Sequence, residues 1–142
     1  MYLKHYLISA IIFLSFFSCD NQQTNPDFPQ VNVNLSIYPG TGTFYDLGAV
    51  GGWMYLGGGV NGLLVYRATQ NGFMVYDRAC PYDPTNPCEQ IEVQNGGGFI
   101  LEDQCCGSTY FISSGEVNSG PSTYNLKQYY SYYNGSELQI GN

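Results

Sequence analysis

Four cysteines in the second half of the chain are the residues with the clearest chemical potential. Cys80 and Cys88 lie in one polar, proline-containing segment, and Cys105 and Cys106 are adjacent in a second segment that continues into Gly-Ser. Thiols can form disulfide bonds, ligate a metal ion or act as a redox pair. The residues around them and the compartment of the protein decide which of these chemistries is favoured.

The spacing of these cysteines is unlike that of a zinc site, where paired ligands usually stand two to four residues apart. Adjacent side chains of an extended backbone point to opposite sides, so Cys105 and Cys106 are not expected to bind one ion together. A thiol switch is disfavoured because Glu102 and Asp103 would raise a thiol pKa and no Lys or Arg is adjacent. Disulfides are favoured, and a metal centre held by cysteines is the alternative.

The N-terminus predicts export from the cytoplasm. A charged start precedes the apolar run 6–17, which is too short for a comfortable membrane span. Ser18 and Cys19 follow at once, and this ending resembles the lipobox of bacterial lipoproteins. We therefore expect residues 1–18 to be a signal peptide and the thiol of Cys19 to be lipidated; the alternative is an ordinary signal peptide with an incidental cysteine.

Lipidation predicts a protein of the bacterial cell envelope, anchored on the periplasmic or the surface side. Residues 19–30 are polar and contain proline, which is typical of a flexible tether, and the domain is expected to cover 31–142. In an exported domain, an even number of cysteines usually forms bridges.

The charge of the chain excludes nucleic acid as a partner. Beyond the predicted signal peptide the basic residues are Arg67, Arg78 and Lys127, against eleven acidic residues. Such a chain cannot follow a phosphate backbone, and it has no attraction to anionic lipid. We expect the lipid anchor to hold the protein at the membrane, with an unidentified envelope protein as partner.

Alternation and turn residues predict an all-β domain. The segment "VNVNLSIY" at 31–38 alternates apolar and polar side chains, as a half-buried strand does. Residues 71–72, 95–98 and 134–135 contain Asn-Gly between β-rich runs, which is a strong hairpin signal. We expect about eight to ten short antiparallel strands in a small sandwich or barrel.

The second half of the chain resembles the Rieske domain family. "GFMVYDRACPYD" at 72–83 is similar to the strand that leads into the first ligand loop of the family, and "GSTYFISSGEVNSGPSTYNLKQY" at 107–129 is similar to the frame after the second. The likeness covers about residues 47–140. It implies a Rieske-like fold with two cysteine-bearing loops and, in a complete family member, a [2Fe–2S] cluster for electron transfer.

The ligand pattern of the family, two cysteines and two histidines, is not matched. By the register of the Gly-Ser motif, the four ligand positions hold Cys80, Tyr82, Asp103 and Cys106. The one histidine of the chain, His5, lies in the predicted signal peptide, so the imidazoles of a Rieske centre are not supplied. We therefore expect no cofactor, with Tyr82 filling the space of the cluster and Asp103 capping a turn.

The resemblance also implies a disulfide pairing. Some Rieske domains link their two loops through a cysteine between the ligands of the second loop, which is Cys105 here, and Cys88 is the available partner. Because neighbouring side chains point apart, we expect the bridges Cys88–Cys105 and Cys80–Cys106. Each would contribute about 3 kcal/mol by loop-closure entropy.

Two functions follow from these observations. The first is a disulfide-stapled structural or binding module of the envelope. The second is an electron-transfer protein with an atypical iron–sulfur or other metal centre at Cys80 and Cys106, with Tyr82 and Asp103 at the other ligand positions. An enzyme is not favoured, because residues 31–142 contain no histidine to act as a general base.

Overall fold

The computed structural model describes residues 23–96 and 98–142, so the predicted signal peptide and Cys19 lie outside the described residues. Apart from one short 3-10 helix, the regular elements of the described chain are short strands, which pair antiparallel and confirm the all-β prediction. The elements in chain order are β1 (Asn34–Ile37), the 3-10 helix η1 (Gly42–Gly48), β2 (Trp53–Leu56), β3 (Leu63–Arg67), β4 (Phe73–Asp77), β5 (Ile91–Val93), β6 (Ile100–Asp103), β7 (Thr109–Phe111), β8 (Val117–Ser119), β9 (Tyr130–Tyr133) and β10 (Leu138–Gly141). Within the described ranges, no helix is long and apolar enough to span a membrane.

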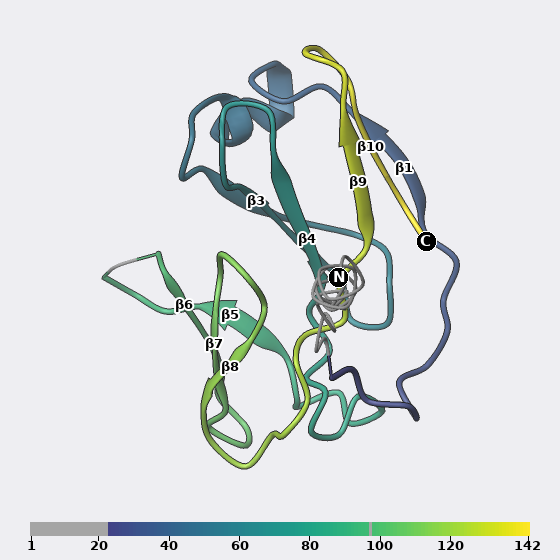
Figure 1. Ribbon diagram of the computed structural model, residues 1–142, viewed down its shortest axis with the longest axis vertical. Helices are drawn as coiled ribbons and strands as arrows, with labels where there is room; N and C mark the ends of the chain where they lie inside the picture. Colours follow the sequence, from purple (N-terminus) through teal and green to yellow (C-terminus); the bar gives the residue numbers. More distant parts are fainter. Residues whose placement is uncertain (1–22, 97) are drawn as a thin grey trace, which may run out of the picture.

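The strands form three sheets in two parts of the molecule. The orders are β1-β10-β9, β2-β3-β4 and β5-β6-β7-β8. The first two sheets lie together in the upper part of Figure 1, and the third forms the lower part. Backbone hydrogen bonds from Tyr129 to Val75 (2.9 Å) and from Asp77 to Lys127 (2.9 Å) join β4 to the segment that precedes β9. The predicted sandwich or barrel is therefore divided into a larger part and a smaller one.

β3 is buried along its whole length and separates two apolar cores. Successive side chains of a strand point to opposite faces. Leu63 and Val65 accordingly pack in the first core, whereas Leu64 and Tyr66 pack in the second. The second core continues into the four-stranded sheet and includes Cys80. β3 therefore contributes side chains to both cores, including the core that contains Cys80.

The three predicted hairpin turns each join paired strands. Residues 71–72 connect β3 to β4, residues 134–135 connect β9 to β10, and the segment around 95–98 connects β5 to β6. Two other connections carry the four cysteines. We name residues 78–90, between β4 and β5, the first loop, and residues 104–108, between β6 and β7, the second loop.

Residues 23–30 were expected to belong to a flexible tether, and they instead contact the domain. The side-chain amide of Asn25 donates to the backbone oxygen of Pro81 (2.7 Å), and Phe28 is buried. The backbone N–H of Asn125 donates to the oxygen of Gln23 (2.9 Å). An apolar side chain and specific hydrogen bonds offset the entropy of ordering this segment, so the folded domain includes it.

Candidate functional site

Cys80 is positioned by the end of β4. The last residue of that strand, Asp77, is fully buried, and its carboxylate accepts four hydrogen bonds. The donors are the backbone N–H groups of Val60 (2.7 Å), Asn61 (3.2 Å) and Ala79 (2.9 Å) and the hydroxyl of Tyr129 (2.8 Å). These bonds hold the start of the first loop, and Cys80 follows as a fully buried residue of the second core.

The second loop is shaped by Asp103, the last residue of β6. One oxygen of its carboxylate accepts the backbone N–H groups of Cys105 (2.7 Å) and Cys106 (3.2 Å). The predicted turn cap is therefore confirmed. Gly107 has a φ of 76°, a left-handed conformation that favours glycine, and its N–H donates to the Asp103 backbone oxygen (2.8 Å). This tight turn holds both cysteines close to the carboxyl group.

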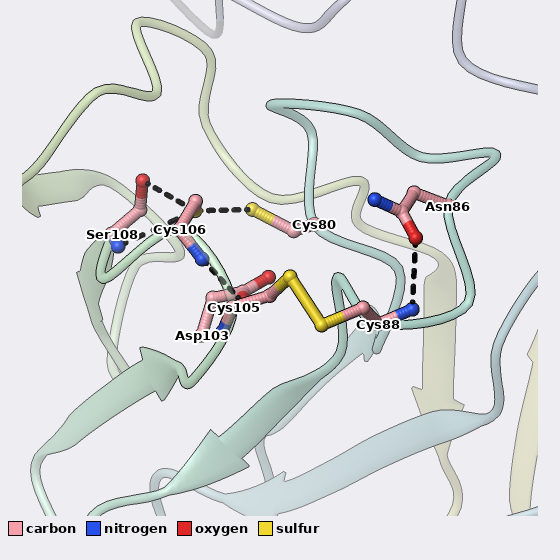
Figure 2. The surroundings of a disulfide bond; sticks show 7 residues. All are labelled: Cys80, Asn86, Cys88, Asp103, Cys105, Cys106 and Ser108. Carbon is pink, nitrogen blue, oxygen red and sulfur yellow. Dashed lines mark hydrogen bonds between the residues drawn. A yellow bond between two sulfur atoms is a disulfide. The ribbon is translucent and has the colours of Figure 1, made fainter.

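A disulfide between Cys88 and Cys105 joins the two loops, as predicted (Figure 2). Their Cα atoms are 5.7 Å apart, which is in the usual range for a bridge. The bond closes a segment with a sequence separation of 17, and loop-closure entropy makes it worth about 3 kcal/mol. Both of its cysteines are exposed, so the bridge lies at the surface.

The second predicted bridge, Cys80–Cys106, is not formed. The two sulfur atoms are 3.8 Å apart and face each other in Figure 2, and both residues are free thiols. Each sulfur has another partner: the Cys80 sulfur lies 3.2 Å from the hydroxyl of Tyr110, and the Cys106 sulfur lies 3.1 Å from the hydroxyl of Ser108. The adjacent cysteines do face different partners, as predicted. Cys105 forms a disulfide with Cys88, whereas Cys106 only faces Cys80.

Two buried carboxyl groups complete a cluster with the free thiols. One potential ligand atom each from Cys80, Glu89, Asp103 and Cys106 lies within 4.8 Å of the others, and we call these residues the four-residue cluster. Glu89 is 4% exposed and Asp103 is 0% exposed, and Cys106 is half-buried. The Glu89 Oε2 and Asp103 Oδ2 atoms accept no hydrogen bond of good geometry in the described part of the chain, and their polar neighbours are the other members of the cluster. A buried polar atom without a partner is costly, so these oxygens require a proton or a cation.

Glu89 was not identified from the sequence. The antiparallel register places Ile91 opposite Asp103, so Glu89, two residues before Ile91, comes to lie beside the second loop. Its position directly after Cys88 was the one available signal, because the bridge to Cys105 ties this part of the first loop to the second. Without the register of β5 against β6, this signal does not place the Glu89 side chain beside Asp103.

Burial controls the protonation of the cluster. Desolvation raises the pKa of the Cys80 thiol and of the Cys106 thiol. Desolvation also raises the pKa of the Glu89 carboxyl, and the neighbouring Asp103 adds to that rise. Without a cation, the two sulfurs are therefore protonated near neutral pH.

The residues present do not fit a Rieske [2Fe–2S] cluster. Tyr82 is 52% exposed, so the prediction that it fills the space of a cluster is wrong. Residues 23–96 and 98–142 contain no imidazole, and the one histidine of the chain, His5, lies outside them. The groups beside Cys80 and Cys106 are the carboxyl groups of Glu89 and Asp103, and such hard oxygen ligands are a poor match for an iron–sulfur centre.

Comparisons with known proteins support the fold. No family model matches the chain, and no curated protein matches it. One similar structure is a chain from the complex of reduced oxygenase and oxidized ferredoxin in carbazole 1,9a-dioxygenase. The alignment has a TM-score of 0.51 and 17% sequence identity, and it covers 75% of this chain and 99% of that chain. The small subunit of an NADH-dependent nitrite reductase from Mycobacterium tuberculosis aligns with a TM-score of 0.47 and 13% identity over 80% of this chain and 97% of that chain.

The sheet arrangement and the likeness to the chain of the carbazole 1,9a-dioxygenase complex show a Rieske-like β fold. At 17% identity the likeness concerns the fold alone. It gives no information about which side chains of this chain could act as ligands. The particular features of this domain are the disulfide between its two loops and the four-residue cluster beside it.

Proposed function

We propose that this chain is a lipid-anchored module of the bacterial cell envelope that keeps a Rieske-like fold but does not carry the [2Fe–2S] cluster. It acts there as a disulfide-stapled structural or binding module, on the periplasmic or the surface side, towards an envelope protein. The observation that carries the proposal is the set of side chains at the four ligand positions, where Tyr82 is 52% exposed and the residues that the structure describes supply no imidazole beside Cys80 and Cys106.

The chemistry of these side chains supports the loss of the cluster. A Rieske centre places two imidazoles on one iron, and those ligands raise its potential. The described chain offers two thiols and two carboxyl groups at the corresponding place. The Cys88–Cys105 bridge supports a module that does not depend on the cluster, because it holds the two loops together covalently.

The lipid anchor and the location rest on the sequence, in which Cys19 directly follows an apolar run. Their test is membrane fractionation of cells that express the full chain or its Cys19→Ser variant. We expect the full chain in the membrane fraction, with acyl mass on Cys19, and the variant outside it. Equal membrane retention of both proteins would contradict the anchor.

The loss of the cluster is tested on the full chain purified in detergent. We expect neither iron nor acid-labile sulfide, no visible absorption, and a gain of two hydrogen atoms per chain on reduction of the single bridge. Iron and sulfide in a stoichiometric ratio, with a visible spectrum, would instead support the alternative that this is an electron-transfer protein with an atypical iron–sulfur centre.

A further inference from the structure

We propose that Cys80, Glu89, Asp103 and Cys106 bind one divalent cation of the zinc type. This inference deepens the proposed function and rests on it, because an ion in the cluster takes the place that a [2Fe–2S] centre would need. The residues come from both loops and from the end of β6, so a bound ion would tie the first loop to the second a second time, inside the surface disulfide.

The spacing of the two sulfurs fits a tetrahedral ion. Zinc binds cysteine sulfur at about 2.3 Å, and two sulfurs at tetrahedral positions around it are then about 3.8 Å apart. The sulfur atoms of Cys80 and Cys106 are 3.8 Å apart and point towards one another from different loops (Figure 2). Neither thiol is taken up by a bridge, whereas the nearby Cys88 and Cys105 are bonded to each other.

The carboxyl groups supply the independent evidence for a ligand. Glu89 Oε2 and Asp103 Oδ2 are buried and accept no hydrogen bond of good geometry within the described chain, although both residues belong to the cluster. The buried Asp77 shows the opposite situation, since four donors satisfy its carboxylate. The fold thus gives both oxygens of the buried Asp77 carboxylate hydrogen-bond donors, but leaves one oxygen of Glu89 and one of Asp103 without a donor beside a pair of thiols. This arrangement has the electrostatics of a cation site.

Groups around the cluster hold its potential ligands in place. The second carboxylate oxygen of Asp103 is fixed by the backbone N–H groups of Cys105 and Cys106. The Cys106 sulfur accepts the backbone N–H of Ser108 (3.4 Å), and the Cys80 sulfur lies within hydrogen-bond distance of the Tyr110 hydroxyl. Such outer contacts orient metal ligands and stabilise thiolate charge. The half-exposed side of Cys106 leaves an entry path for the ion.

The donor set selects among common ions. Calcium and magnesium require oxygen ligands and leave the two sulfurs unused. Zinc accepts both cysteine sulfur and carboxylate oxygen, and four protein ligands make the closed, tetrahedral arrangement of a structural site. Two thiolates and two carboxylates carry more negative charge than the ion neutralises, but N–H and hydroxyl donors face them, as in other thiolate-rich zinc sites.

The test measures zinc and cobalt binding to the full chain, purified in detergent without thiol reductant and under anaerobic conditions, so that the bridge and the free thiols both persist. After treatment with a chelator, zinc is titrated against a chromophoric competitor, and cobalt is added separately as a spectroscopic probe. Glu89→Gln is the test variant. Glu102→Gln is the matched control, because Glu102 is the neighbour of Asp103 on β6 and its carboxylate binds Gln94 at the exposed surface (3.1 Å).

We expect one zinc ion per wild-type chain. The affinity for zinc should be unchanged in Glu102→Gln and lower by about 10- to 100-fold in Glu89→Gln. The cobalt complex should show sulfur-to-metal charge-transfer absorption that Cys80→Ser removes. Near-ultraviolet circular dichroism checks that each variant is folded, and the isosteric Glu89→Gln change keeps the test decisive if Cys80→Ser unfolds.

Three results would overturn the site: no stoichiometric zinc, equal affinity in Glu89→Gln and Glu102→Gln, or a cobalt complex without thiolate absorption. A chain that holds no iron as purified and takes up no zinc in the titration would overturn this inference and leave the proposed function standing. Iron with acid-labile sulfide in the purified protein would overturn both.

Discussion

Removal of the Cys88–Cys105 bridge is the perturbation whose magnitude follows most directly from the structure. The double variant Cys88→Ser, Cys105→Ser deletes the bond without leaving an unpaired thiol. Because both cysteines are exposed, the change removes little buried surface, and its effect is mainly that of opening the loop. For a sequence separation of 17, the chain-entropy relation gives about 3 kcal/mol of stability lost at 25 °C.

A loss of that size is large for a domain of this length. At roughly 4 °C per kcal/mol, it corresponds to a Tm lower by about 12 °C. The assay is reversible urea unfolding followed by circular dichroism, with a thermal scan as the second measurement. The unbridged unfolded chain is more expanded, so we also expect a steeper dependence of the unfolding free energy on urea.

The same variant distinguishes the contribution of the disulfide from that of a metal ion in the four-residue cluster. Zinc should stabilise the double variant as well as the wild type, because the ligands of the four-residue cluster are unchanged. A loss below about 1 kcal/mol would refute the loop-closure reasoning, since the exposed sulfurs leave no other stabilising role of that size. The control is wild-type protein kept in a thiol reductant throughout unfolding, which opens the exposed bridge and leaves Cys80 and Cys106 unmodified.

Three further predictions concern the fold that carries the cluster. Asp77→Ala should cost at least about 3 kcal/mol of unfolding free energy, because it leaves buried donors without their acceptor; a loss under about 1 kcal/mol would contradict that network. Leu64→Ala should cost about 2–5 kcal/mol by opening a cavity in the second core, and a neutral result in urea unfolding would refute the packing described for β3. Burial raises the pKa of Tyr76, Tyr110 and Tyr129. Above about pH 10 each of these tyrosines should therefore lower the unfolding free energy by about 1.4 kcal/mol per pH unit, because the unfolded chain loses a proton that the folded chain keeps; this adds to the decline that the buried thiols begin at lower pH. Tyr76→Phe should make that alkaline slope shallower by one proton, and an unchanged slope would contradict its burial.

The elements that depend on neighbours in sequence could be predicted without the structure. The hairpin turns at 71–72 and 134–135 lie where Asn-Gly separates β-rich runs, because turn conformation is decided by a few adjacent residues. The Cys88–Cys105 pairing followed from the likeness to the Rieske family and from the opposite directions of adjacent side chains.

The cluster itself depended on packing between segments that are distant in sequence. Whether Cys80 and Cys106 bond or only face each other at 3.8 Å depends on how β4 and β6 approach across the second core. Tyr82 is largely exposed, although the resemblance to the Rieske family assigns its position to a ligand. Glu89 joins the thiols through a strand register that no local pattern encodes.

The sequence alone therefore determined which residues could react and which segments could pair, since residue type and local turn conformation are properties of the chain itself. The tertiary structure alone decided which thiols remain free, which carboxyl groups are buried beside them, and that residues 23–30 belong to the folded domain. Distances of a few ångströms between side chains are set by how whole strands and loops pack, and that packing is a property of the entire fold.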